Sequence, residues 1–119
     1  MDKEIVLKDE DFGKKYSGKY VFRSIGWGLV NRISAECTKV EPASQMTTVD
    51  VKALNAKMIM ATLIIKPDAI KLEHLLDESD KGLPPVLGEF LMMVTDLVNG
   101  YGPEQRSELK KLKEQWDLE

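Results

Sequence analysis

The feature that most constrains this chain is an almost continuous apolar run, MIMATLII, from Met58 to Ile65. Only Thr62 interrupts the run, so a helix through it would be apolar on almost every side. Such a helix must be surrounded by other elements, because water would otherwise meet its apolar side chains. The run spans eight residues, whereas a membrane helix needs about twenty. We therefore expect the central helix of a bundle and no membrane span.

Further helices are expected on both sides of this run. Apolar residues recur every four positions at Ile25, Leu29, Ile33 and Cys37, which is the spacing of one helix face, and Ser24 is a candidate N-cap. A loop is expected at VEPASQMTT, and the central helix should run from Thr48 or Asp50 to about Lys66, because Pro67 disfavours helical geometry in the residue before it. Three more helices are expected, in the order PDAIKLEHLLDES, about Pro85 to Val98, and from Pro103 onward.

Two short segments near the amino terminus have strand character. They are Lys3–Lys8 and Lys19–Arg23, separated by the turn-rich stretch DEDFGKKYSG. We expect them to pair as a β-hairpin. The sequence thus predicts a mainly α fold, a small helical bundle of four to five helices with a short N-terminal β-hairpin.

A chain of 119 residues with 43% hydrophobic and 31% charged residues is typical of one globular domain. We expect a single domain over 1–119, made of a hairpin region (1–23), a helical core (24–100) and a charged C-terminal helix (101–119).

The charge and the cysteine count restrict the partners and the compartment. A net charge of −3 disfavours binding to nucleic acid or to an anionic membrane. The amino terminus, MDKEIVLKDEDF, lacks the apolar stretch of a signal peptide, and Cys37 is the only cysteine. We therefore expect a cytoplasmic protein.

Residues for catalysis or metal binding are scarce. His74 is the only histidine, and we expect it to be solvated, whereas Cys37 lies on an apolar helix face and is expected in the core. The segment from Asp77 to Gly82 resembles the start of a calcium loop, but Lys81 stands at a ligand position and the bidentate glutamate is absent. From the sequence we expect that the protein is not an enzyme and that it binds no cofactor and no metal ion.

The stretch from Lys14 to Arg23 offers an alternative function. It interleaves four basic residues with Tyr16, Tyr20 and Phe22, a pattern typical of single-stranded nucleic-acid binders. The acidic charge of the whole chain argues against this function, and the same aromatic residues would equally well anchor the hairpin to the bundle.

The order of several elements resembles the tail assembly chaperones of long-tailed phages and of related archaeal proviruses. The resemblance runs from about Gly18 to Gly100 and rests on GKYVFR, IGWGLVNRI, MATLIIKP and LPPVLGEFLMMVTDLVNG. It implies a protein that coats the hydrophobic tape measure protein in the host cytoplasm and helps to recruit tail tube subunits. In many members of that family a translational frameshift adds a second domain to a minority of chains.

Apolar residues that the core does not need are candidates for a groove that binds the tape measure protein, here called the client. Methionine-rich surfaces adapt to varied partners. If the resemblance holds, the partner-binding residues are predicted to be Met60, Ile64, Phe90, Met93 and Leu97, with Trp27 as a contributor. The charged last helix, with its apolar edge of Leu109, Leu112 and Trp116, is a candidate for self-association or for contact with tail subunits. A head-to-tail connector protein and a cellular helical adaptor stay open as alternatives.

Overall fold

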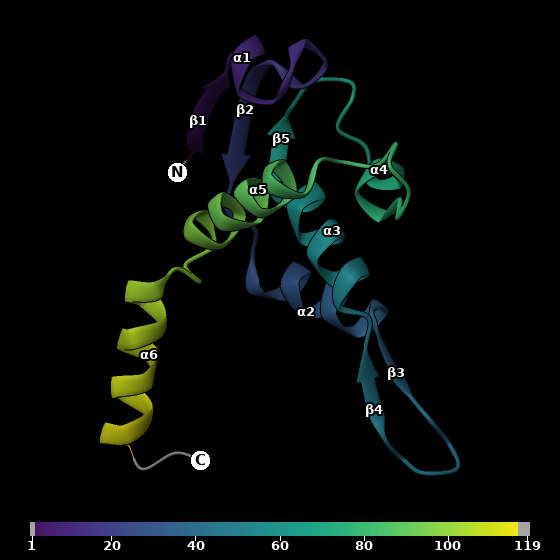
Figure 1. The fold of residues 1–119 in the computed structure, drawn as a ribbon. Coiled ribbons are helices and arrows are strands. Elements are labelled where there is room, and N and C mark those ends of the chain that lie inside the picture. Colours follow the sequence, from purple (N-terminus) through teal and green to yellow (C-terminus); the bar gives the residue numbers. More distant parts are fainter. Residues whose placement is uncertain (1, 117–119) are drawn as a thin grey trace.

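The computed structural model describes residues 2–116, which form two small sheets and six helices (Figure 1). Helix accounts for 53% and strand for 18%, so the predicted fold class, a helical bundle with a single hairpin, is wrong. The strands are β1 (Asp2–Leu7), β2 (Gly18–Arg23), β3 (Thr38–Val40), β4 (Thr47–Val49) and β5 (Leu63–Ile65). The helices are α1 (Asp9–Phe12), α2 (Trp27–Glu36), α3 (Val51–Thr62), α4 (Leu72–Leu76), α5 (Pro85–Val98) and α6 (Pro103–Gln115), with a 3-10 turn η1 (Lys14–Tyr16).

The expected N-terminal hairpin is present. β1 and β2 pair antiparallel, with Asp2 opposite Arg23 and Leu7 opposite Gly18. The stretch between them folds into α1 and η1, where a plain turn was expected. The Tyr20 hydroxyl donates a 2.6 Å hydrogen bond to the Tyr16 carbonyl, which ties this connection to β2.

The first departure from a bundle is the third strand, β5. The central helix was expected to continue to about Lys66, but α3 ends at Thr62 and Leu63–Ile65 joins the free edge of β2, giving the order β1-β2-β5. Two β-branched isoleucines favour extended backbone, and Pro67 disfavours helix in the residue before it. The open edge of β2 supplies hydrogen-bond partners for this extended segment.

The second departure is a two-stranded sheet in the segment that was expected to be a loop. β3 and β4 pair antiparallel, with Thr38 opposite Val49 and Val40 opposite Thr47. Threonine and valine dominate both strands, and such β-branched residues favour pleated backbone. The strands connect α2 to α3 as a hairpin that stands apart from the rest of the chain (Figure 1).

The helices also differ from expectation at some ends. α2 begins at Trp27 after Gly26, and no side chain caps it, so the expected Ser24 cap is wrong. The Asp50 side chain accepts a hydrogen bond from the Ala53 N–H at the start of α3, as one of the two expected caps. α4 is shorter than predicted, while α5 has the predicted bounds and α6 begins at the predicted proline. Met1 and residues 117–119, which the predicted domain and last helix include, lie outside the described residues.

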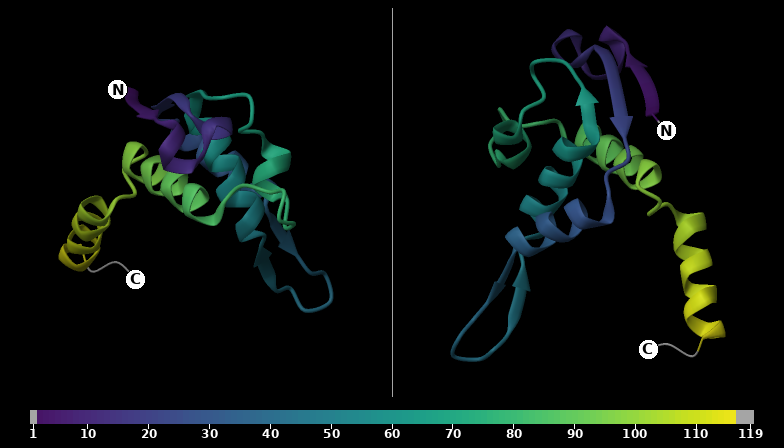
Figure 2. Two further views of the ribbon diagram at one scale, coloured as in Figure 1. Left: turned by 45° about the horizontal axis from the view of Figure 1, so that its top comes forward. Right: turned by 180° about the vertical axis from the view of Figure 1, so that it is seen from behind.

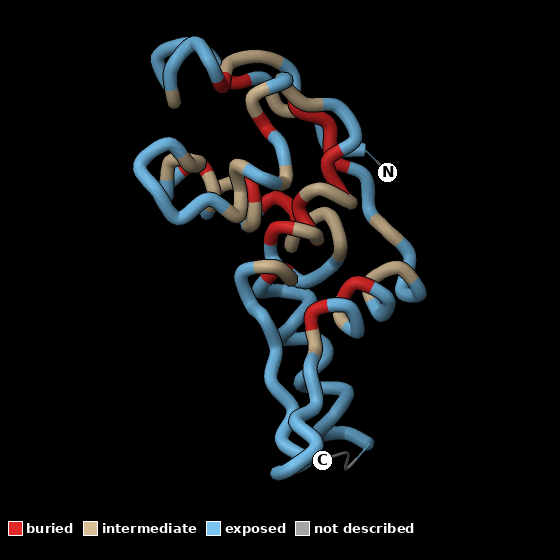
Figure 3. The backbone as a smooth tube through the Cα atoms, turned by 90° about the vertical axis from the view of Figure 1, so that its right-hand side faces the viewer, coloured by how far each residue is buried: buried red, intermediate tan, exposed pale blue. Residues whose placement is uncertain are grey.

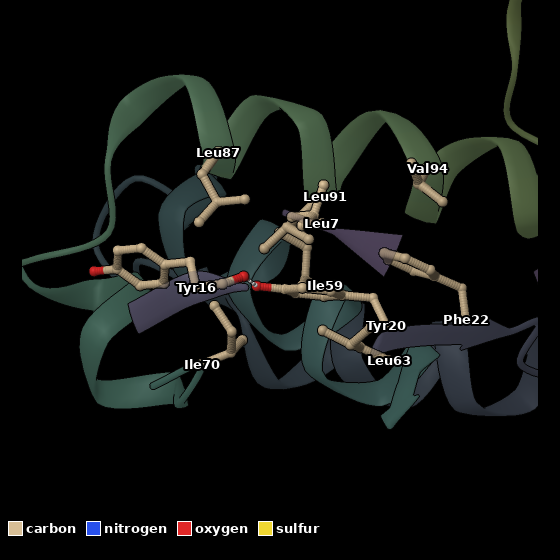
Figure 4. Packing of buried hydrophobic residues seen from close by; sticks show 10 residues of the cluster. All are labelled: Leu7, Tyr16, Tyr20, Phe22, Ile59, Leu63, Ile70, Leu87, Leu91 and Val94. Atoms are coloured by element: carbon tan, nitrogen blue, oxygen red, sulfur yellow. Dashed lines mark hydrogen bonds between the residues drawn. The ribbon is translucent and has the colours of Figure 1, made fainter. Parts of the chain in front are cut away.

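The core consists of two clusters of buried side chains. The larger one packs the three-stranded sheet, α3 and the loop before α4 against α5, and ten of its residues are drawn in Figure 4: Leu7, Tyr16, Tyr20, Phe22, Ile59, Leu63, Ile70, Leu87, Leu91 and Val94. The smaller one lies between α2 and α3 and is built on Ile33, Cys37 and Met58. Met92 on α5 packs against both clusters.

Two arms project from this core. The radius of gyration of 16.5 Å exceeds the value of about 13.5 Å that a compact domain of this length would have. Figures 1 and 2 show α6 and the β3–β4 hairpin extending away from the sheet and α5. Every residue of α6 is exposed, as is nearly all of the hairpin, and the pale blue lower part of Figure 3 marks these segments. None of the helices in the described part of the chain has the length and apolar character that crossing a membrane requires.

Candidate partner-binding surface

An apolar stripe runs along the outer face of α5. It consists of Val86, Phe90, Met93 and Leu97, spaced four, three and four residues apart, and is here called the α5 stripe. Met93 is 52% exposed and Leu97 48%, while Phe90 is half-buried and its ring lies 6.4 Å from that of Phe12. The adjoining face of α5, about a quarter turn away, carries Leu87, Leu91 and Val94 into the core. The helix is therefore apolar on two adjoining faces, of which one is buried and the other is exposed except at Phe90.

The lower half of the stripe opens into a groove between α5 and α6. This α5–α6 groove has a volume of about 480 Å³ and is lined by Glu89, Met92, Met93, Asp96, Leu97, Tyr101, Gly102, Pro103 and Arg106. Most of its lining surface is apolar, and of its charged residues Glu89 and Arg106 are exposed and Asp96 is half-buried. A volume of this size is in the range that accommodates several side chains of a docked segment.

The linker between α5 and α6 sets the shape of this groove. Gly100 has φ of +81°, a conformation that disfavours other residues, and the Tyr101 N–H donates a 2.7 Å hydrogen bond to the Asp96 carbonyl. Gly102 is buried, and a Cβ there would lie 2.7 Å from the Leu97 Cδ2. A larger residue there would require the Leu97 and Gln105 side chains to shift, so the start of α6 packs closely on the end of α5.

One ion pair crosses the groove. Arg106 Nη2 lies 3.9 Å from Asp96 Oδ2. The pKa of Asp96 is raised above its ordinary value because partial burial disfavours the carboxylate, and the Arg106 guanidinium opposes this shift. The ion pair is long and Arg106 is largely exposed, so the pair contributes little to stability.

A second groove lies on the other side of α5. It has a volume of about 350 Å³ and is bounded by α3, α4 and the Leu83–Pro84–Pro85 entry to α5. Glu89 and Met92 line both grooves, so the two meet across these side chains. Lys52 lies in its wall and pairs with Glu78 at 2.6 Å.

The structure brings together some of the predicted client residues and separates others. Met93 and Leu97 share the groove, and Phe90 lies on the same stripe. Met60 is partly buried against the larger core cluster, while Ile64 is exposed on β5 and Trp27 is 79% exposed at the start of α2. None of these last three lines either groove beside α5.

Sequence reasoning missed Val86, Asp96, Tyr101 and Arg106. Val86 extends the four-three spacing of the stripe by one turn, and this signal was present in the sequence. The other three depend on the angle between α5 and α6, which no sequence pattern specifies.

The positions of the aromatic residues argue against the alternative function of single-stranded nucleic-acid binding. Tyr20 and Phe22 have no exposed surface and Tyr16 is buried, so none of the three can stack on a base. Two of the basic residues are engaged with β1, because Arg23 pairs with Asp2 at 2.8 Å and Lys19 lies 3.6 Å from Glu4.

The residues considered above for catalysis or metal binding are packed in the core or hydrogen-bonded to the backbone. Cys37 is buried in the smaller cluster, as expected. His74 is half-buried, contrary to the expected solvated position, and its Nδ1 lies 2.8 Å from the Ala69 carbonyl, to which it donates. In the loop after α4, Asp77 Oδ1 accepts a hydrogen bond from the Ser79 N–H. Among the described residues, no three His, Cys, Asp or Glu side chains are grouped to hold a metal ion.

Comparison with protein-family models, curated proteins and solved structures finds no match to this chain.

Proposed function

We propose that this chain is a non-enzymatic binding protein that covers an apolar helical segment of a client protein. The α5 stripe carries this proposal, because Val86, Met93 and Leu97 are exposed at helical spacing and the half-buried Phe90 continues their row. An amphipathic helix recognises such a surface by laying its own apolar side chains into it. Val86, Met93 and Leu97 are each about half exposed or more, so a partner can reach the stripe at both ends of α5.

The α5–α6 groove would orient the client. Leu97 and Tyr101 supply apolar walls, while Asp96 and Arg106 put opposite charges at the rim. A rim of this kind selects the charge pattern of a partner more than it adds affinity. The flexible and exposed side chain of Met93 can repack against varied apolar residues, as a surface for a long and repetitive client requires.

We further propose that the client is a tape measure protein and that the chain is a tail assembly chaperone acting in the host cytoplasm. The resemblance in the segments GKYVFR, IGWGLVNRI, MATLIIKP and LPPVLGEFLMMVTDLVNG supports this identity. The last of these segments contains the whole of α5, so the resemblance and the exposed stripe coincide. Recruitment of tail tube subunits would use a surface away from the stripe.

Co-expression with the tape measure and tail tube proteins of the same genome tests this proposal. We expect the chain to co-purify with the tape measure protein and to lose it in the Met93→Asp variant, because a carboxylate in the groove cannot be buried unpaired. Met46→Asp is the matched control, since Met46 is similarly exposed but lies in the distant β3–β4 hairpin. Equal loss in both variants, or no capture by the folded wild-type chain, would contradict the proposed function.

A further inference from the structure

The chain exposes far more surface than its mass requires. Its accessible surface is 8553 Å², compared with about 6,500 Å² for a compact monomer of 13.5 kDa. The excess of about 2,000 Å² is as large as the total area buried in a standard stable interface. Part of it comes from α6, whose apolar edge of Leu109, Leu112 and Trp116 is between half and two-thirds exposed.

The α6 edge matches the α5 stripe residue by residue. Leu109, Leu112 and Trp116 are spaced three and four residues apart, which is the spacing of Phe90, Met93 and Leu97 on α5. Each member of the first set lies nineteen positions after its counterpart in the second. Two helices with this shared spacing can interdigitate as in a coiled coil, with three apolar layers in register.

The charges beside the two apolar rows specify the direction of packing. Glu89 and Asp96 flank the α5 stripe seven residues apart, and Arg106 and Lys113 flank the α6 edge with the same separation. In a heptad repeat with apolar positions a and d, the two acids of α5 occupy position g, just before a. The two bases of α6 occupy position e, just after d. In the matched register, parallel packing places Glu89 of one copy against Lys113 of the other. Antiparallel packing would instead place the acidic flank of α5 against Glu108 of α6.

The linker is too short for the two helices of one chain to pack in this way. In the matched register, Pro103 would lie beside the start of α5, about 23 Å from Val98 when the length of α5 and the helix separation are combined. Residues 99–102 reach about 18 Å even when fully extended. The α6 that fits this stripe in parallel must therefore belong to another molecule.

We propose that α6 of one copy of this chain packs in parallel along the α5 stripe of a second copy. Phe90, Met93 and Leu97 then meet Leu109, Leu112 and Trp116 of the second copy, and Glu89 faces its Lys113. Each chain offers one stripe and one edge, so the contact closes as a reciprocal dimer or continues from copy to copy. If the proposed function holds, the second copy occupies the stripe that the client needs, so assembly keeps this surface covered until a client displaces it.

Molar mass in solution tests the contact itself. We expect light scattering coupled to gel filtration to give masses above 13.5 kDa for the wild-type chain, rising with concentration through the micromolar range. Leu112→Asp should be monomeric throughout, whereas Ser107→Asp, with the same added charge on the opposite face of α6, should associate as the wild type does. Because both positions are exposed, both variants should keep the wild-type circular dichroism. A monomeric wild-type chain, or association that survives Leu112→Asp, would overturn the proposal.

Charge reversal tests the parallel direction. Glu89→Lys and Lys113→Glu should each weaken association several-fold, and the double variant should recover it, because the opposite charges are then exchanged across the contact. Singles that weaken association without recovery in the double variant would exclude the parallel register.

The client assay separates this inference from the proposed function. Leu112→Asp should capture the tape measure protein at least as well as the wild-type chain, since its stripe is uncovered. A chain that associates with itself but captures no client would refute the proposed function and leave the self-contact standing. A monomeric wild-type chain that captures the client would refute only the self-contact.

Discussion

At the scale of single residues, Asn99 joins three segments that are far apart in the sequence. Its Oδ1 accepts a 2.9 Å hydrogen bond from the Ile25 N–H, and its Nδ2 donates one of 2.9 Å to the Thr62 Oγ1. Thr62 is fully buried at the end of α3, and Ile25 precedes α2. Asn99 is the C-cap of α5, and the same side chain fixes the approach of the chain to α2.

Replacing Asn99 with alanine should destabilise the fold. The change leaves the Ile25 N–H and the Thr62 hydroxyl without their partner, at a cost of about 2 kcal/mol in the free energy of unfolding. Urea unfolding followed by circular dichroism measures this loss. Asn31→Ala is the matched control, because Asn31 is exposed on α2 and should change stability by less than about 0.5 kcal/mol. Equal effects in the two variants would show that the bridge contributes nothing.

Tyr20 should make the fold sensitive to alkaline pH. Burial raises the pKa of Tyr20 to about 12, with a smaller contribution from Tyr16, whereas an unfolded tyrosine titrates near 10. The folded state holds the proton more tightly, so this stabilisation is complete below pH ~10 and is lost as the pH rises towards 12, by about 2 to 3 kcal/mol.

Urea unfolding at pH 8 and pH 11 measures this loss. Tyr20→Phe should lose less stability over that interval than the wild-type chain, because the titrating hydroxyl is gone. Tyr101→Phe, at an exposed position, should behave as the wild type. An identical pH dependence in all three chains would contradict the assignment.

At the scale of elements, the local sequence pattern predicted the segments whose structure does not depend on contacts with distant parts of the chain. The β1–β2 hairpin, α5 and the start of α6 follow from strand alternation, helix spacing and proline position. β5 was missed because Leu63, Ile64 and Ile65 suit a buried helix and a strand equally well, and only the free edge of β2 decides between them. In the candidate site, Met93 and Leu97 were selected by apolar spacing, whereas Tyr101 and Arg106 enter the groove only through the α5–α6 angle.

The β3–β4 hairpin should be dispensable for folding. Its strands pair with each other alone, and the Asp50 N–H donates a 2.8 Å hydrogen bond to the Cys37 carbonyl where the hairpin begins and ends. Replacing residues 38–49 with a short Gly-Ser turn should therefore change the free energy of unfolding by less than about 1 kcal/mol. Cooperative urea unfolding with a wild-type midpoint would agree with this expectation, and loss of the cooperative transition would contradict it.

At the scale of the whole molecule, the extended shape is the property that a single compact core does not explain. Small-angle scattering of the monomeric Leu112→Asp chain should give a radius of gyration close to 16.5 Å. A value near 13.5 Å, typical of a compact domain of this length, would mean that α6 or the hairpin folds back onto the core in solution.

The division of the core into two clusters has a consequence for how the molecule opens. The cluster beneath α2 has three buried members, compared with ten in the cluster beneath the sheet, and Met92 and the Asn99 bridge connect the two. A region held by so few buried contacts opens at a lower free energy than the region around it. In a native-state hydrogen-exchange experiment, the backbone amides of α2 should therefore exchange through a partial opening, whereas those of β2 should exchange only through global unfolding. The α2 region would then detach and reattach while the three-stranded sheet and α5 stay folded.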